Sequence, residues 1–157
     1  TYSVKALVGL MNSKLATYYH FNNSPKATKG AFPKILVQDV KDFPLPINLL
    51  DSILELLVDY ILLSIQRGIS ELDELEDIID ALVFELYFPQ DFQSKGIEIE
   101  KHAKELFAPI EGLSEEKKSE KIKAVYEELR KKENPLRNQI KLMKIELKDL
   151  LLPILSV

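Results

Sequence analysis

The apolar stretch over residues 48–66 constrains the fold more than any other part of the sequence. Its apolar side chains cover most of the surface of a helix and leave one narrow polar stripe, formed by Asn48, Asp51, Ser52, Glu55 and Asp59. A helix that is apolar almost all round packs between neighbouring helices. The stretch is nearly long enough to cross a membrane, but the acidic residues within it argue strongly against a membrane span. We therefore expect it to be the central helix of a bundle, ending at Gly68.

Helical periodicity predicts further helices on both sides of this stretch. Residues 3–21 form one expected helix, which the turn-forming residues up to Pro25 bring to an end. Residues 70–87 form another, with a capping-box-like start at Ser70 and an end at the Phe88-Pro89 pair. Its short connection predicts antiparallel pairing with residues 48–66. Residues 96–108 form another expected helix, so the chain is predicted to be mainly α-helical.

Two charged helices are expected near the C-terminus, over residues 114–132 and 135–151. Ser114 is the expected N-cap of the first, and Asn134 with Pro135 gives the N-cap and first helical residue of the second. A heptad-like apolar seam follows, formed by Leu136, Ile140, Met143, Leu147 and Leu150. We expect a helical hairpin that projects from the bundle, or packs on a partner or on a part of a longer parent protein.

The charge distribution divides the chain into three expected units. Residues 1–47 have a net charge of +4, residues 48–112 of −11 and residues 113–157 of +3, within a total of −4. We expect the middle segment to be the helical bundle and the last segment the charged hairpin. Only the two ends of the chain are suited to contact phosphate.

Composition excludes several kinds of site. The chain has no cysteine, so disulfides and thiolate metal sites are excluded, and its two histidines, His20 and His102, are too far apart in sequence to suggest a zinc site. An apolar content of 46% is enough for a proper core. No signal peptide is visible, which favours a cytoplasmic location. Because the sequence begins inside an expected element without an initiator methionine, we expect a fragment of a longer protein.

The least generic part of the sequence is residues 30–46. Pro33 restricts the preceding residue to extended backbone, and residues 35–37 form a short β-prone run of Ile, Leu and Val. Residues 38–42 are expected to form a single helical turn, followed by an extended exit at the two prolines of residues 44–46. The segment therefore predicts a small β or extended element near residues 32–46. Its aromatic residues, Phe32 and Phe43, are expected to be core anchors.

This segment and its surroundings resemble a known family. The order is Leu-Met-Asn-Ser-Lys-Leu on a helix (residues 10–15), a Lys/Gly loop, Gly-x-Phe-Pro-Lys from Gly30, Asp-Val-Lys-Asp-Phe-Pro-Leu-Pro from Asp39, and a long helix. Together with Asp-Ala-Leu-Val-Phe-Glu-Leu-Tyr at residues 80–87, it resembles the end of the target-recognition domain in TaqI-type N6-adenine DNA methyltransferases and type IIG restriction–modification enzymes. The resemblance covers about residues 3–90, and a looser one exists to the specificity subunits of type I restriction systems.

The resemblance implies that residues 1–47 are the tail of a DNA target-recognition domain in a cytoplasmic prokaryotic protein. Its implied partners are double-stranded DNA and the remainder of the parent chain. Lysines of the basic loop would then contact phosphate, and neighbouring side chains would lie near the backbone or base edges. The candidate DNA-binding residues are His20, Asn22, Asn23, Lys26, Lys29, Gly30 and Lys34. The alternative for the same residues is an ordinary solvated surface loop.

Catalytic motifs of such a parent are missing from this sequence. The family implies an Asn/Asp-Pro-Pro-Tyr/Phe loop and a glycine-bearing cofactor motif, but here Asn134-Pro135 is followed by Leu136 at an expected helix start. The Glu-Leu-Lys run at residues 146–148 matches half of a nuclease motif and is typical of solvated helix surface. We expect no catalysis, metal or cofactor in this chain, whereas the resemblance implies a parent that uses S-adenosylmethionine and Mg²⁺.

Two alternatives stay open. Basic residues near the C-terminus could form a second phosphate track, although interleaved glutamates are more typical of a solvated, salt-bridged helix. These basic residues are Lys117, Lys118, Lys121, Lys123, Arg130, Lys131, Lys132 and Arg137. The chain could instead be a helical protein–protein interaction module, with residues 48–66 or 135–151 contacting a second copy or another subunit. That function predicts a mass that depends on concentration.

Overall fold

The computed structural model of the chain describes residues 3–24, 35–51 and 53–157. Every regular element in those ranges is a helix, which confirms the predicted mainly-α class. The helices are α1 (Val4–Met11), α2 (Lys14–Asn23), α3 (Val37–Lys41), the short 3₁₀ helix η1 (Ile47–Asp51), α4 (Leu54–Gln66), α5 (Asp73–Tyr87), α6 (Pro89–Ser94), α7 (Ile99–Leu106), α8 (Glu115–Arg130), α9 (Pro135–Glu146) and α10 (Lys148–Leu155).

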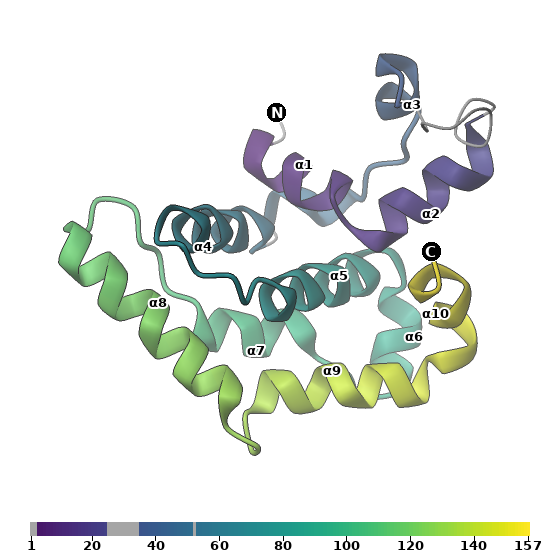
Figure 1. The fold of residues 1–157 in the computed structure, drawn as a ribbon. Helices are drawn as coiled ribbons and strands as arrows, with labels where there is room; N and C mark the ends of the chain where they lie inside the picture. Colours follow the sequence, from purple (N-terminus) through teal and green to yellow (C-terminus); the bar gives the residue numbers. More distant parts are fainter. Residues whose placement is uncertain (1–2, 25–34, 52) are drawn as a thin grey trace.

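The helices are arranged in tiers around α4 and α5 (Figure 1). Helix α1 packs on α4 and α2 packs on α5, while α8 lies against α4 on the other side and α7 and α9 lie against α5. Helix α10 returns to contact α2, so the C-terminus lies near the N-terminal helices. One continuous hydrophobic core results, and it contains buried side chains from all three segments that charge distinguishes.

The N-terminal helix predicted as one piece is two helices joined at Asn12 and Ser13. The Ser13 side chain accepts a hydrogen bond from Ala16 N at 3.2 Å and donates one to Leu10 O at 2.7 Å. Short polar side chains that bond to the nearby backbone compete with a continuous helix. The break turns α2 away from α1, so that α1 covers α4 and α2 covers α5.

The predicted central helix over residues 48–66 is also interrupted. Its first residues form η1, where Leu49 N donates to Pro46 O at 3.3 Å in the i→i+3 pattern of a 3₁₀ turn. Helix α4 follows and is buried on one side, with Leu57 and Tyr60 at 0% exposure. On its other side Leu62 and Ile65 are 48% and 55% exposed. Helix α4 therefore packs between α1, α5 and α8 as expected, but part of its apolar surface stays exposed.

Helix α5 has the most complete burial of the bundle, ends before the Phe88-Pro89 pair as predicted, and differs from its prediction at its start. It begins at Asp73 after Leu72, which makes no side-chain capping hydrogen bond, so the predicted cap at Ser70 is wrong. At the other end Pro89 does not simply stop the helix but starts α6. Proline is favoured at a first helical position because its fixed φ suits the helix and its missing N–H is not needed there.

Helix α7 starts later than expected because Gly96 adopts a positive φ of 65°. The start at Ile99 is fixed by the Glu85 side chain of α5, which accepts hydrogen bonds from Ile99 N at 3.1 Å and Glu100 N at 2.7 Å. Burial raises the pKa of this carboxyl, and the two backbone donors oppose that shift. A side chain far away in sequence therefore caps this helix, which local patterns cannot reveal.

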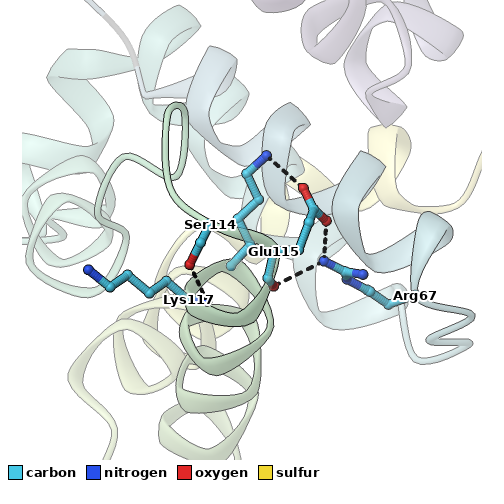
Figure 2. Close-up of polar contacts among 5 residues, drawn as sticks. Arg67, Ser114, Glu115 and Lys117 are labelled. Atoms are coloured by element: carbon cyan, nitrogen blue, oxygen red, sulfur yellow. Dashed lines mark hydrogen bonds and ion pairs between the residues drawn. The ribbon is translucent and has the colours of Figure 1, made fainter.

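Both predicted N-caps near the C-terminus are confirmed. Ser114 Oγ accepts from Lys117 N at 3.3 Å, and Asn134 Oδ1 accepts from Arg137 N at 3.0 Å. Figure 2 shows how the start of α8 is also joined to the end of α4, since Arg67 donates to both the backbone and the side chain of Glu115.

The C-terminal helices do not project from the bundle. Helices α8 and α9 diverge from their connection instead of running along each other (Figure 1), and α8 packs on α4 whereas α9 packs on α7 and α5. The seam residues Leu136, Ile140 and Met143 are buried in the core of this same chain. The apolar seam that suggested contact with a partner is therefore buried against other helices of the same chain.

The described part of the predicted β element, from residue 35 onward, contains no strand. Val37 is the first residue of α3, and Asp39 Oδ2 accepts a hydrogen bond from Leu36 N at 2.7 Å. This carboxylate at the third helical position satisfies a backbone donor at the helix start, which outweighs the β propensity of the run. The predicted helical turn at residues 38–42 is confirmed. Gly30, Phe32 and Pro33 lie outside the described residues.

Candidate nucleic-acid interface

A cavity of about 410 Å³ lies between α2 and α3, and two of the candidate DNA-binding residues, His20 and Asn23, line it. Helix α2 and the residue that ends α1 supply one wall, and α3 with its flanking residues supplies the other. The lining residues are Met11, Ala16, Thr17, Tyr19, His20, Phe21, Asn23, Ser24, Ile35, Asp39, Asp42 and Phe43.

Phe43 anchors the α3 side of this cavity to the body of the protein. Its side chain is buried, and its ring meets the rings of Tyr19 and Tyr87 edge-on, with centroid distances of 5.0 and 6.1 Å. The Tyr87 hydroxyl donates to Pro44 O at 2.6 Å, and burial raises the pKa of this phenol. The prediction that Phe43 is a core anchor is confirmed, and this anchor holds α3 opposite α2.

His20 lies in the last turn of α2 and lines the cavity between α2 and α3. Its side chain is 12% exposed, and its Nδ1 lies 3.8 Å from Asp39 Oδ2, beyond hydrogen-bonding distance. Neither ring nitrogen has a hydrogen-bond partner among the residues that the structure describes, and the same is true of Ser24 Oγ. Buried polar atoms without partners are uncommon in folded proteins.

The two candidate asparagines are exposed at the C-terminal end of α2. Asn22 Nδ2 donates to Tyr18 O at 2.7 Å, and Asn23 Nδ2 donates to Tyr19 O at 2.9 Å. Each amide therefore keeps its oxygen and one N–H for another partner. Of the two, Asn23 lines the cavity.

The remaining candidates, Lys26, Lys29, Gly30 and Lys34, lie outside the described residues. The residues on either side of that segment are described, and both Ser24 and Ile35 line the cavity. The basic segment is therefore connected at both of its ends to the border of the cavity.

Sequence reasoning missed the acidic side of this site. Asp39 and Asp42 both line the cavity, and neither was among the candidates. Their i, i+3 spacing was a usable signal, because residues three apart lie on the same face of a helical turn. The aromatic lining from Tyr19 and Phe21 was also not predicted, because residues 3–21 were expected to form one long amphipathic helix.

In the second group of basic residues, three of the eight form ion pairs with acidic side chains. Lys118 pairs with Glu115 at 3.4 Å, and Arg130 and Lys131 pair with Glu71 and Glu128. On α9, Lys144 pairs with Asp77 of α5 at 3.0 Å. These acidic partners reduce the positive potential that a phosphate would meet.

Other sequence features take ordinary structural places. Glu146, in the half nuclease motif, pairs with Lys95 at 3.4 Å on the surface, while the adjacent Leu147 is buried. Among the helices of residues 3–24, 35–51 and 53–157, none combines the length and the apolar run needed to cross a bilayer.

Comparison of the chain with protein-family models, with curated proteins and with solved structures finds no match in any of the three. The resemblance to TaqI-type enzymes therefore rests on the sequence motifs alone and stays a hypothesis.

Proposed function

We propose that this chain is part of a DNA target-recognition module, with the C-terminal end of α2, the basic segment after it and α3 facing duplex DNA. The observation that carries the proposal is that Ser24 and Ile35, the described residues on either side of the basic segment, both line one cavity. His20 and Asn23, chosen from sequence, line the same cavity. On this hypothesis the helical body from α4 to α10 positions the recognition end for a catalytic domain of a parent restriction–modification protein.

The proposed contacts divide by chemistry. Lys26, Lys29 and Lys34 would neutralise phosphates, which supplies affinity but no sequence information. Asn22 and Asn23, whose amides keep a free acceptor and a free donor, would lie near the backbone or base edges. We expect weak binding by this chain alone, since the charge of −4 repels DNA overall and the resemblance covers only the end of a recognition domain.

A salt titration of duplex binding tests the proposal. The logarithm of the binding constant falls with the logarithm of salt concentration by about 0.9 for each phosphate neutralised. Changing Lys26, Lys29 and Lys34 together to alanine should weaken binding and lower that slope by about 2 to 3 if each lysine contacts one phosphate. Fluorescence anisotropy with a labelled duplex, beginning at low salt, gives both quantities.

The matched control changes Lys117, Lys121 and Lys123 of α8 to alanine, which removes the same charge from an exposed surface. This control should leave the slope nearly unchanged. Equal salt slopes for the wild type and the Lys26, Lys29 and Lys34 variant would contradict the proposal. Equal losses of binding affinity in the two variants would also contradict it, because they would indicate a nonspecific effect of net charge.

A specific observation also favours the second candidate function, a protein–protein interaction module. Helices α1 and α4 pack together and expose apolar side chains beside each other, with Val8 46% and Leu62 48% exposed and both lining one cavity of about 360 Å³. The residue 135–151 seam is buried within the chain, so the α1–α4 face is the surface on which this function would depend. Sedimentation across a range of concentrations tests it, with Leu62→Ser expected to reduce any association.

A further inference from the structure

The cavity between α2 and α3 has the size and walls of a site for a flat organic ring. Its volume of about 410 Å³ lies within the range of small-molecule sites. Tyr19 and Phe21 on α2 and Phe43 beyond α3 supply aromatic surface, and Ile35 supplies aliphatic surface. Aromatic side chains bind unpaired nucleobases by stacking, whichever base is present.

The polar groups of the cavity are mainly acceptors. Asp39 uses Oδ2 to accept from Leu36 N, and Asp42 uses Oδ1 to accept from Gln38 Nε2 at 2.7 Å. The second oxygen of each carboxylate has no hydrogen-bond partner among the described residues. Asn23 adds a free amide oxygen and one free N–H, because only one of its two N–H donors is bonded to Tyr19 O. A ligand that fits these groups must therefore present hydrogen-bond donors.

The negative charge of the two carboxylates further limits the kinds of ligand that the cavity can bind. Two carboxylates on one cavity disfavour a phosphate or a carboxylate inside it, because like charges repel. They favour an exocyclic amine, as glutamate and aspartate do when they accept from the amino group of cytosine. His20 lines the same cavity, but both of its ring nitrogens are buried, so the expected polar contacts to the base are those of the two carboxylates and Asn23.

We propose that this cavity binds an unstacked nucleobase through its amine-bearing edge, with Asp39 and Asp42 accepting from the exocyclic amine. This inference rests on the proposed DNA-recognition function, because a base reaches such a cavity only after it leaves the stack. Adenine and cytosine, and guanine through its 2-amino group, present an exocyclic amine on the pairing edge and are the expected occupants, whereas uracil, thymine and hypoxanthine, which have no exocyclic amine, are excluded. Phosphate contacts would remain with residues outside the cavity.

Ligand-observed NMR titration with free nucleosides tests the inference on the whole chain. Adenosine and inosine differ by an amine in place of a carbonyl, and cytidine and uridine differ in the same way. Adenosine should bind at least about fivefold more tightly than inosine, since correct pairing at a base edge is worth about 1 to 3 kcal/mol. Equal binding of the two, or no saturable binding of either, would overturn the inference without any variant being needed.

Variants then assign the contact to the carboxylates. Asp39→Asn combined with Asp42→Asn keeps side-chain shape and one acceptor on each residue but removes the charge. It should abolish the preference for adenosine over inosine, whereas Asp73→Asn combined with Asp91→Asn on other helices should leave the preference unchanged. Circular dichroism confirms that each variant is folded. A retained preference in the first variant would contradict the assignment.

The outcomes separate this inference from the proposed function. A lysine-dependent salt slope without discrimination between adenosine and inosine would retain DNA recognition and reject the base-binding cavity. Discrimination without any duplex binding would instead indicate a nucleoside site and reject the DNA-recognition proposal.

Discussion

Helices α5 and α3 are both rich in apolar residues, but they differ in what they bury. In α5, eight residues are buried, including Leu75, Ala81 and Phe84 at 0% exposure. In α3 none is buried, and Val37 is 73% exposed. The difference follows from length and position. A helix of 15 residues between two layers can pack on several neighbours, whereas a five-residue helix held beside its neighbours has little contact surface.

This contrast separates stability from the candidate function. The body around α5 buries the apolar surface that drives folding. The region around α3 is attached through the aromatic cluster of Tyr19, Phe43 and Tyr87 and leaves polar and apolar groups exposed or lining a cavity. Residues that bind partners are commonly found on such weakly packed segments beside a rigid body.

The largest expected effect is at the centre of α5. Phe84→Ala removes a fully buried ring and leaves a cavity where close packing existed. The free energy of unfolding should fall by about 3 to 5 kcal/mol. Urea denaturation followed by circular dichroism measures this. A loss below about 1 kcal/mol would break the comparison, because it would mean that α5 is not the packed centre.

The next effect is at Asp80, the buried charged residue of α5 that contacts α2. Its Oδ1 accepts from Lys14 N at 2.7 Å, so Asp80→Leu leaves that N–H without a partner. The free energy of unfolding should fall by about 1 to 3 kcal/mol. Asp80→Asn, which keeps an acceptor, should cost less when unfolding is measured in the same way, and a larger loss for Asn than for Leu would contradict this role.

The pH dependence of the free energy of unfolding gives a second test of Asp80. Burial raises the pKa of Asp80, although the hydrogen bond from Lys14 N opposes the shift. The folded state therefore binds the proton more tightly than the unfolded state, and the Asp80 contribution to stability falls as pH rises from the ordinary aspartate value through the raised folded value. Asp80→Asn should remove this fall. Urea denaturation at several pH values from 3 to 7 checks the sign.

A smaller effect is expected at the edge of the body. Ser114→Ala removes the N-cap of α8 and should lower the free energy of unfolding by about 1 kcal/mol. Ser119→Ala on the same helix is a matched control, since no cap depends on it among the described residues. Thermal denaturation of both variants gives the difference. Equal effects would show that helix propensity, and not the cap, is being measured.

The smallest effect is expected on α3. Val37→Ser and Val40→Ser replace exposed apolar side chains and should change the free energy of unfolding by no more than about 0.5 kcal/mol each. Urea denaturation of both variants and of Phe84→Ala under the same conditions compares their free energies of unfolding directly. A loss above about 2 kcal/mol in either variant would break it, because α3 would then belong to the stabilising core.

The sequence predicted well those features that depend on neighbouring residues. Ser114 and Asn134 cap helices as expected, because an N-cap is a contact between a side chain and the backbone three residues later. The helical turn at residues 38–42 was predictable for the same reason, whereas Phe43 was expected to be an anchor from its aromatic side chain and not from a local contact. The break at Ser13 was missed, because the flanking apolar residues keep helical spacing and the polar Ser13 alone did not indicate a helix end.

The candidate site was only partly predictable. His20 and Asn23 were selected from a motif, and the structure places them with Asp39 and Asp42 at one cavity. Asp39 became a wall of the site because Phe43 fixes α3 opposite α2, and that placement depends on contacts with Tyr19 and with Tyr87, which is much farther along the chain. No local pattern contains that information.

The sequence alone therefore determined the helical class, the positions of the local caps and the segregation of charge, since each depends on residue type and short spacing. The tertiary structure decided which apolar faces are used inside the chain. It buried the seam of α9 in the chain's own core and left α3 and the α1–α4 face exposed. The physical reason is that burial depends on which helices meet in space, and helices meet through contacts between residues that are far apart in the sequence.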